Sequence, residues 1–336
     1  MKQEIFKSEK VSETPAVSVV IPAYNAAGHI GEALDSVFAQ TFTDYELIVV
    51  NDGSPDTEDL ERVLGPYLER LVYIKQENRG PSGARNTAIR KAQGTYVAML
   101  DSDDMWLPEF LAEQMTFLTA NPEVDLVYTD AWIFGDTELA GRTFMQGAPS
   151  RGQISFESLL RYETQIITSC TVLRRAAAID AGLFDEEFIR CEDFDLWIRL
   201  AHRGHRMSYQ RKVLAKHRMH SSSLASQQVK MVEAQIEVLK KAQRTLALTQ
   251  SQRELIDGQL QNCDAQINLE LSKDYFVTRD YQKAAKSLRR ANSFYNSRKL
   301  SLVIWGLSLA PRILHLLYVL RRNLGRSSLR RHATQK

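Results

Sequence analysis

Short apolar runs alternate with helical periodicities over the first hundred residues of this chain. Four apolar runs are bounded by turn residues and are typical of buried strands. They lie at 17–22, 45–50, 71–74 and 96–100. Between them, apolar side chains recur every three or four positions, which predicts helices at 26–40, 57–67 and 81–92. This alternation predicts an α/β fold in which a mostly parallel sheet is flanked by helices on both faces.

The pattern loosens after residue 100 and becomes purely helical near residue 226. We expect helices at 108–119, 156–162 and 194–203, and strands at 125–134, 169–173, 206–209 and 213–216. The strand at 125–134 is expected to join the sheet as an antiparallel or mixed addition. Amphipathic helices follow at 233–248, 254–274 and 281–291, and Tyr275–Ala291 has the cadence of a tetratricopeptide-like hairpin.

These patterns predict four parts of the chain. They are a polar leader at 1–15, an α/β domain at 16–224, a helical extension at 225–298, and an amphipathic basic helix with its tail at 299–336. The leader has no apolar signal segment, which disfavours secretion.

Composition narrows the class of protein. The 336 residues are 44% hydrophobic and 25% charged, as in an ordinary globular protein, and the net charge of +2 gives no nucleic-acid footprint. Cys170, Cys191 and Cys263 have neither zinc-site nor disulfide spacing. Their pattern favours a reducing compartment.

An acidic cluster, Asp101, Asp103 and Asp104, directly follows the apolar run at 96–100. Burying an unpaired carboxylate is costly, so a cluster at a strand end indicates a divalent cation such as Mg²⁺ or Mn²⁺. The alternative is a solvated acidic turn before the helix that Pro108 starts.

Polar residues also follow the other three predicted strands, at 22–25, 51–54 and 77–86. Each set alone is ordinary turn chemistry. Because the carboxyl ends of parallel strands share one edge of a sheet, the sets together indicate a ligand site.

A later acidic group, Glu192, Asp193 and Asp195, opens the helix at 194–203. Acids there either favour the helix N-terminus or, beside aromatic residues, supply a general base. Asp195 has the further alternative of an ion pair with Arg199 at i+4.

Taken in order, these motifs resemble the inverting glycosyltransferases of family 2, of the kind that builds bacterial cell-surface polysaccharides. The resemblance spans residues 16 to about 224 and rests on 17–25, 50–54, 78–86, 101–104 and 192–197. It implies the GT-A fold and sugar transfer from a nucleotide sugar, by default a UDP-sugar, to a glycan or lipid-linked acceptor.

The resemblance also implies a role for individual residues. Asp52 would accept a hydrogen bond from the nucleobase, Asp103 would ligate Mn²⁺ or Mg²⁺, and Asp193 would be the general base. His220 is a further candidate contact to the metal or the diphosphate. The other implied donor-binding residues are Pro22, Ala23, Tyr24, Asn25, Gly80, Arg85, Asp101 and Ser102. The implied acceptor or loop residues are Glu192, Trp197 and Arg218. Which of Glu192, Asp193 and Asp195 faces the acceptor stays open.

The most apolar run of the chain is 300–320, and no Asp or Glu follows Arg298. Its length suits a membrane span, but Arg312 near its middle makes spanning costly. Because Arg312, His315 and Arg322 share one helical face, an amphipathic helix on an anionic membrane surface is favoured. The alternative is packing on the helical extension, which could also bind a second copy of the chain.

The leading hypothesis is therefore a metal-dependent transferase in the cytoplasm, peripheral at the inner face of the cell membrane. A non-catalytic binding or scaffold protein on the same fold is the main alternative. A sugar-nucleotidyltransferase is weaker, because no Gly-rich phosphate loop follows the first predicted strand. The absence of G-x-G-x-x-G at the same place argues against a dinucleotide-dependent oxidoreductase.

Overall fold

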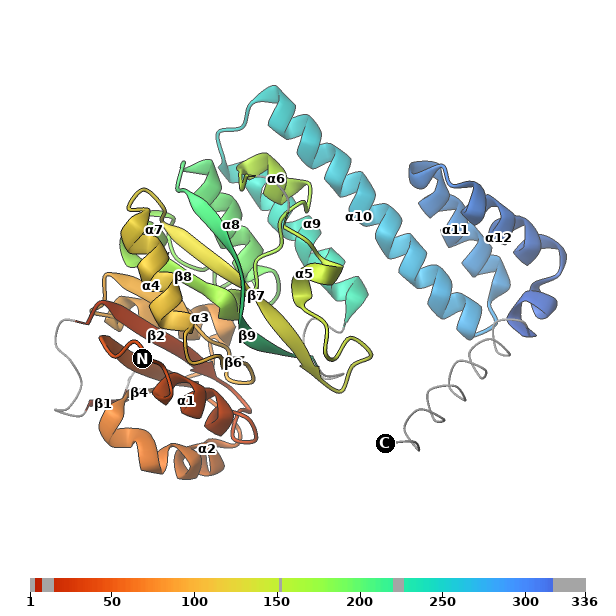
Figure 1. The fold of residues 1–336 in the computed structure, drawn as a ribbon. Coiled ribbons are helices and arrows are strands. Elements are labelled where there is room, and N and C mark those ends of the chain that lie inside the picture. Colours follow the sequence, from red (N-terminus) through yellow and green to blue (C-terminus); the bar gives the residue numbers. More distant parts are fainter. Residues whose placement is uncertain (1–3, 8–14, 151–152, 220–226, 317–336) are drawn as a thin grey trace. The chain divides into compact units, whose positions relative to one another are not determined.

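The computed structural model describes residues 4–7, 15–150, 153–219 and 227–316 (Figure 1). Within these residues, nine strands form one sheet in the order β1-β4-β3-β2-β5-β8-β7-β9-β6. The strands are β1 (Glu4–Lys7), β2 (Val17–Ala23), β3 (Tyr45–Asp52), β4 (Val72–Gln76), β5 (Tyr96–Met99), β6 (Met105–Trp106), β7 (Leu126–Gly135), β8 (Thr171–Arg174) and β9 (Met207–Met219).

The four strands predicted first form the parallel part of the sheet. β2 pairs in parallel with β3 on one side and with β5 on the other, and β4 extends the parallel run beyond β3. β8 is antiparallel to both β5 and β7, whereas β7 is parallel to β9. The mixed addition expected at 125–134 is thereby confirmed, and the mostly parallel α/β class with it.

Two local expectations are wrong. Residues 4–7 lie within the expected polar leader, yet they form β1, which pairs antiparallel with β4 from Glu4↔Lys75 to Lys7↔Val72. The two short strands expected near residues 206–216 are one strand, β9, whose register with β7 shifts around Asp130. The register shift accommodates the polar residues between the two apolar ends of β9, as β-bulges do.

Helices cover both faces of the sheet (Figure 1). They are α1 (Ile30–Phe38), α2 (Thr57–Leu64), α3 (Gly80–Lys91), α4 (Phe110–Ala120), α5 (Phe144–Gly147), α6 (Phe156–Leu160), α7 (Arg175–Asp180) and α8 (Glu192–His202). Successive side chains of β2 enter different cores: Val19 joins the apolar cluster that includes α1 and α4, and Val20 joins the one that includes α3 and α8. A continuous apolar strand is required because both faces are buried.

Contacts along the chain define two units. We call residues 1–226 with 241–248 the sheet unit, and residues 227–240 with 249–336 the helical unit. The helix α9 (Gln228–Thr245) therefore contributes to both. The helical unit continues with α10 (Gln250–Val277), α11 (Tyr281–Tyr295) and α12 (Arg298–Leu309). A small core that includes Ala284, Leu288 and Leu307 joins α11 to α12, so no boundary falls at residue 298.

The single helix expected over 300–320 is interrupted. α12 ends at Leu309, Ala310 leaves the helical conformation, and a further helical stretch covers 311–316. Pro311 explains the break, since proline lacks an N–H and disfavours a helical residue before it. In the described part of the chain, no helix combines the length and the apolar character that crossing a bilayer requires.

The polar face expected on that helix is also revised by the packing. His315 lies against the rings of Phe276, at 5.2 Å between centroids, and Tyr281, at 6.0 Å. Leu314 packs on the small core that contains Leu307. Arg322 and residues 317–320 lie outside the described residues. His315 is therefore packed against aromatic rings, although it lines the same groove as Arg312.

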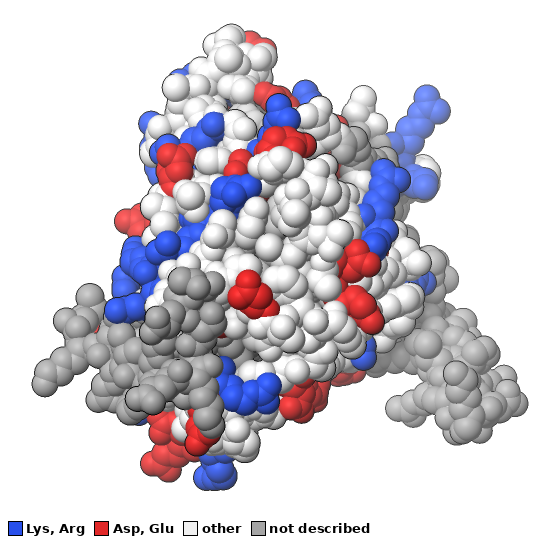
Figure 2. Space-filling model, turned by 60° about the vertical axis from the view of Figure 1, so that its left-hand side comes forward, with Lys and Arg blue, Asp and Glu red and all other residues white. Residues whose placement is uncertain are grey.

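Charged side chains of both signs are mixed on the surface shown in Figure 2, and a broad uncharged area lies among them. This mixture agrees with the small net charge of +2.

Gly94, just before β5, gives a test of the packing at this edge of the sheet. A Cβ atom at Gly94 would lie 2.6 Å from the backbone nitrogen of Ser18, which cannot move without disturbing β2. Gly94→Ala should therefore lower the free energy of unfolding by about 1–3 kcal/mol, measured by chemical denaturation. Gly65→Ala is the control, because that Cβ would meet no atom within 4 Å and the backbone there is helical. Equal stability of the two variants would contradict this close approach.

Candidate functional site

The loops after β2 and β3 are joined at the carboxyl edge of the sheet. Strand register places Ala23 opposite Asn51, and the Asn51 side chain accepts a hydrogen bond from the backbone N–H of Ser54 at 2.9 Å. The Ser54 hydroxyl in turn accepts the backbone N–H of Asn25 at 2.6 Å. Asn25 has φ +52°, a left-handed conformation that asparagine tolerates better than most residues. Pro22 and Ala23 thus end β2 and Asn25 follows it, directly beside the polar end of β3.

Asp52 ends β3 and is buried in this loop cluster. Its Oδ1 accepts hydrogen bonds from the Gln76 side chain at 2.6 Å and from the backbone N–H of Arg79 at 2.9 Å. Burial raises the pKa of the Asp52 carboxyl, and these hydrogen bonds offset the effect in part. At Gly53, where φ is +64°, a Cβ would lie 2.8 Å from the backbone nitrogen of Asn78. The loops after β3 and β4 therefore hold Asp52 in a fixed position.

Arg85 links the acidic cluster to the start of α8. Its side chain points from α3 and only 5% of it is exposed. Nη2 donates to Oδ1 of Asp101 at 2.6 Å, and Nη1 donates to Oε1 of Glu192 at 2.7 Å. A buried arginine with both ends engaged holds its two partners in place. The residues that the sequence placed in separate motifs are in this way brought together.

Asp193 lies next to that bridge. Its carboxylate accepts the Thr168 hydroxyl at 3.0 Å and the backbone N–H of Phe194 at 2.7 Å. Burial raises the pKa of Asp193 despite these bonds, and the nearby charge of Asp101 raises it further. Burial likewise raises the pKa of Glu192 to about 7, against the lowering effect of Arg85. Raised carboxyl pKa values suit a group that must accept a proton near neutral pH.

Strand β9 fixes the turn that carries the acidic cluster. Asp104 is buried and faces inward, where it contacts Nδ1 of His217 at 3.0 Å and accepts the backbone N–H of Arg218 at 2.7 Å. Burial acts to lower the pKa of His217, but the Asp104 carboxylate outweighs it and raises the pKa to about 9. In the metal-free protein His217 is therefore held as a cation by the buried Asp104 carboxylate near neutral pH.

Arg218 acts on the same turn. Its Nε donates to the backbone carbonyl of Asp103 at 2.9 Å, and Nη2 pairs with Glu32 at 2.5 Å. The guanidinium also stacks on the ring of Phe134 at 4.4 Å. Arg218 therefore secures the acidic turn from the side of β9, which is a positioning role.

The acidic turn fits a divalent cation that also binds substrate. Asp101, Ser102 and Asp103 are each partly exposed, whereas Asp104 is buried. Among the described residues, no three His, Cys, Asp or Glu side chains are grouped so as to hold a metal by themselves. Mg²⁺ in particular is commonly held by one or two carboxylates together with substrate phosphates. His220, the other candidate ligand, lies outside the described residues.

Two expected site residues have other surroundings. Trp197 is 2% exposed and belongs to the core beneath α8, where its ring lies 6.5 Å from that of Phe184. It therefore has a packing role in this structure. Tyr24 is 55% exposed just beyond β2, so its ring is open to a ligand or to solvent.

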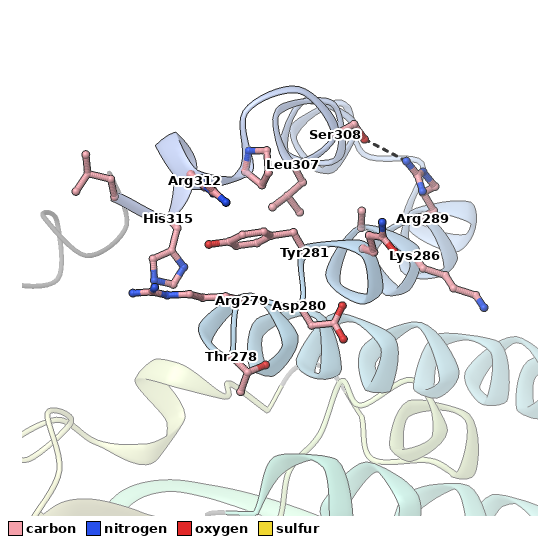
Figure 3. Close-up of a pocket in the computed structure, with 14 residues that line it drawn as sticks. Thr278, Arg279, Asp280, Tyr281, Lys286, Arg289, Leu307, Ser308, Arg312 and His315 are labelled. Atoms are coloured by element: carbon pink, nitrogen blue, oxygen red, sulfur yellow. Dashed lines mark hydrogen bonds between the residues drawn. The ribbon is translucent and has the colours of Figure 1, made fainter.

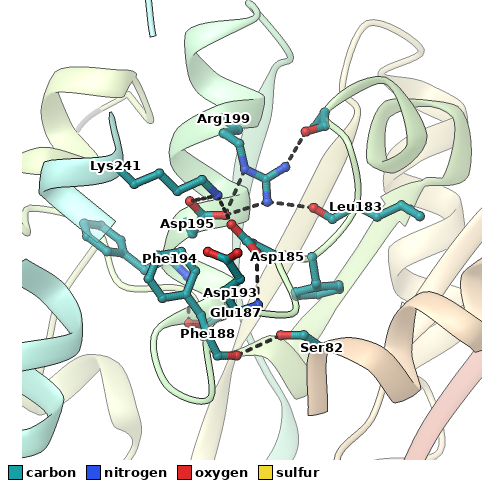
Figure 4. Close-up of polar contacts among 12 residues, drawn as sticks. Ser82, Leu183, Asp185, Glu187, Phe188, Asp193, Phe194, Asp195, Arg199 and Lys241 are labelled. Carbon is teal, nitrogen blue, oxygen red and sulfur yellow. Dashed lines mark hydrogen bonds and ion pairs between the residues drawn. The ribbon is translucent and has the colours of Figure 1, made fainter. Parts of the chain in front are cut away.

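A second charged cluster supports α8 from below (Figure 4). Asp195 contacts Arg199 at 2.6 Å, as the i+4 alternative expects, and it also contacts Nζ of Lys241 at 2.8 Å. Lys241 reaches Asp185 at 2.6 Å as well. Asp195 is buried and held by two cations, whereas Glu192 and Asp193 are partly exposed at the start of α8.

Several residues of the site carry no signal in the sequence. Thr168, Gln76 and Lys241 lie outside every motif, and their roles depend on contacts with distant segments. His217 does belong to the basic segment near the end of the sheet unit, but only its contact with Asp104 distinguishes it from a solvated histidine.

Lys241 and its neighbour Lys240 form a natural pair of variants. Lys241→Met removes the ion pairs that Lys241 makes with the buried Asp195 and with Asp185. We therefore expect a loss of about 2–4 kcal/mol in the free energy of unfolding. Lys240 pairs with Glu237 on an exposed surface, and Lys240→Met should change stability by less than about 0.5 kcal/mol. Urea denaturation of both variants measures the difference. Similar small losses would show that the buried cluster does not hold α8.

The contact between His217 and Asp104 predicts a pH dependence. The pKa of His217 is raised from 6.5 to about 9, so its stabilising effect is complete below the lower value and is lost as pH rises through the upper one. In metal-free protein, the stability difference between wild type and His217→Gln should shrink by about 2–3 kcal/mol between roughly pH 6 and pH 10. Denaturation at a series of pH values measures it, and a constant difference would contradict the ion pair.

The sequence is similar to those of known proteins that share one family. The model of glycosyl transferase family 2 matches residues 18–182. The uncharacterized glycosyltransferase RP339 of Rickettsia prowazekii is 30% identical over 238 residues, which cover 69% of this chain and 71% of the relative. The UDP-Glc:alpha-D-GlcNAc-diphosphoundecaprenol beta-1,3-glucosyltransferase WfgD of Escherichia coli is 29% identical over 66% of this chain and 85% of its own. Other relatives, in Rickettsia felis and Rickettsia conorii, are much longer, and the matched region spans only 35% and 34% of them.

Two solved structures share the fold. TarS of S. aureus, in complex with UDP-GlcNAc, superposes with a TM-score of 0.60 at 18% identity, over 89% of this chain and 88% of its own. The mannosyltransferase PcManGT of Pyrobaculum calidifontis, with GDP-Man and Mn²⁺, gives 0.61 at 20% identity, over 91% and 84%. Both are of the GT-A type expected from the sequence. The family match, the identity to full relatives and the shared fold agree, and the chain belongs to glycosyl transferase family 2.

Proposed function

We propose that this enzyme is a metal-dependent, inverting glycosyltransferase that moves a sugar from a UDP-sugar to a hydroxyl of a lipid-linked glycan. The observation that carries the proposal is the buried Arg85, which holds Asp101 and Glu192 at the same time. Donor-side and acceptor-side acids are therefore next to each other, as direct transfer between two substrates requires.

The donor site is assigned to the carboxyl edge of the sheet. Asp52 is buried and fixed by Gln76 and Arg79, and it can accept a hydrogen bond from the imide N–H of a uracil. Asn25 and the backbone of Pro22 to Tyr24 flank this nucleotide site, and Gly80 shapes its wall at the start of α3. Asp101 would reach the ribose, and Ser102 beside it would also contact the donor. A UDP donor is supported by the names of WfgD and of the TarS complex.

Asp103 would hold Mn²⁺ or Mg²⁺. A bound divalent cation supplies charge that stabilises the diphosphate as it leaves. The mannosyltransferase PcManGT, which shares the fold, is described in complex with Mn²⁺. The buried pair of Asp104 and His217 and the contact of Arg218 with Asp103 keep the turn in place for this purpose.

Asp193 is the proposed general base. Its carboxylate takes the proton from the acceptor hydroxyl, and the acceptor oxygen forms a bond to the anomeric carbon of the donor sugar. The bond between that carbon and the phosphate oxygen breaks, and the nucleoside diphosphate leaves with the electron pair. Attack from the face opposite the leaving group inverts the anomeric configuration. Burial raises the pKa of Asp193, which favours proton uptake in this step.

The acceptor class follows from a relative and fits the inferred place of action. WfgD is named for an acceptor that carries diphosphoundecaprenol, a lipid. We infer a lipid-linked acceptor for this chain as well, in the assembly of a surface polysaccharide. The enzyme would then act peripherally at the inner face of the cell membrane.

The test separates donor binding from transfer. Purified protein is incubated with a panel of nucleotide sugars, Mn²⁺ and diphosphoundecaprenol-linked sugars, and nucleoside diphosphate release is measured. We expect release with one donor and its loss with EDTA or in Asp103→Asn. Asp193→Asn should still bind the donor by calorimetry but lose about 10²–10⁴-fold in turnover. Asp136→Asn, an exposed acid in the sheet unit, is the control and should keep full activity.

Different results would contradict different parts of the proposal. Release that persists in EDTA would contradict the metal assignment, and full turnover in Asp193→Asn would contradict the base. Neither binding nor release with any donor would favour a non-catalytic scaffold on this fold.

A further inference from the structure

The helix α12 is apolar on two opposite sides. Leu300, Ile304 and Leu307 pack into the small core of the helical unit. The other side carries Leu302, Trp305 and Leu309, whose exposed fractions are 68%, 65% and 65%. We call these three residues the exposed stripe.

The exposed stripe follows one side of the helix. Its members are three and four positions apart, so they lie along the same side of the helix. Ile313 and Leu316 follow in the next helical stretch and are 62% and 58% exposed. Contiguous apolar surface of this kind marks a contact with another molecule or with a membrane.

Charge identifies the kind of partner. The chain up to Asp280 has 30 Lys and Arg against 41 Asp and Glu, whereas the 56 residues after it have 13 Lys and Arg and no Asp or Glu. Arg298, Lys299 and Arg312 are exposed at the two ends of the stripe. A strongly basic segment beside apolar side chains, one of them Trp, is typical of proteins that lie on anionic lipid.

A basic groove adjoins α12 (Figure 3). It is lined from α11, from the turn before it and from residues 307–316, and its volume is about 1490 Å³. Its cationic lining residues are Arg279, Lys286, Arg289 and Arg312. Within the described lining, the one acid is Asp280, which pairs with Lys283 at 2.9 Å. The groove therefore offers cations to phosphate groups.

We propose that the exposed stripe, with the cations Arg298, Lys299 and Arg312 at its ends, docks the enzyme on an anionic membrane surface. The leucines and Trp305 enter the boundary between headgroups and acyl chains, while the cations pair with lipid phosphates. The proposal rests on the proposed function in one respect, since a lipid-linked acceptor gives the contact its use. A contact between two copies through this face would place like charges opposite one another, which disfavours it.

The test measures lipid binding without activity. The full chain is sedimented with vesicles of phosphatidylcholine alone and with vesicles of equimolar phosphatidylcholine and phosphatidylglycerol. We expect binding to the anionic vesicles that weakens with salt. Trp305→Ser should lower the partition coefficient about tenfold or more, and Arg312→Glu at least about fivefold. The matched controls are Ile179→Ser and Lys91→Glu, which alter exposed residues of the sheet unit and should bind like wild type.

Three results would overturn the proposal. They are no binding to anionic vesicles, equal binding to both vesicle types, and unchanged binding in Trp305→Ser. Light scattering in the absence of lipid tests the rival occupant: a dimer that Trp305→Ser dissociates, together with unchanged vesicle binding, would assign the stripe to a second copy. Nucleoside diphosphate release with the donors and lipid-linked acceptors of the activity test is measured in parallel. Vesicle binding without any turnover would leave the docking surface standing and count against the proposed function alone.

Discussion

The contact on which the site depends is the buried guanidinium of Arg85 between Asp101 and Glu192. Burying the charge of Arg85 is costly, and close pairing with two carboxylates offsets the cost. Arg85 achieves this pairing by drawing together a turn after β5 and the first residue of α8, which lie ninety residues apart in the chain. The same pairing fixes Asp193 relative to Asp101, because Asp193 directly follows Glu192. Geometry for a two-substrate reaction thus comes from one arginine side chain.

The remaining polar contacts hold this arrangement from outside. β9 secures the acidic turn through His217 and Arg218, and the cluster around Asp195 secures α8 on its other side. Each of these contacts joins the acids to a segment that comes later in the chain, β9 in the first case and α9 in the second. The sheet supplies a stable edge, and the later segments set the exact positions of the acids along it.

The sequence was sufficient to predict the architecture and to locate the acids at the ends of the strands, for a physical reason. Apolar strands buried on both faces must be continuous runs, and ligand-binding residues of such sheets follow those runs directly, so β2, β3 and β5 and the polar residues after them could be located. The sequence was insufficient where a role depends on long-range contact. Lys241, Thr168 and Gln76 have no local pattern, and β1 has polar character because it lies at an edge of the sheet. Trp197 is the reverse case. It lies in the same motif as the acids, but the turn of the helix directs its side chain into the core.

α9 has a consequence for modular evolution. Residues 241–248 group with the sheet, while the residues on either side of them group with the helical unit. The helical extension therefore cannot be replaced as a unit that begins directly after the last strand of the sheet. A recombination event near residue 225 would separate Lys241 from Asp195 and remove a support of α8, whereas a crossover after Leu248 would keep it. Lineages that replace the helical extension should preserve this short stretch as part of the catalytic core.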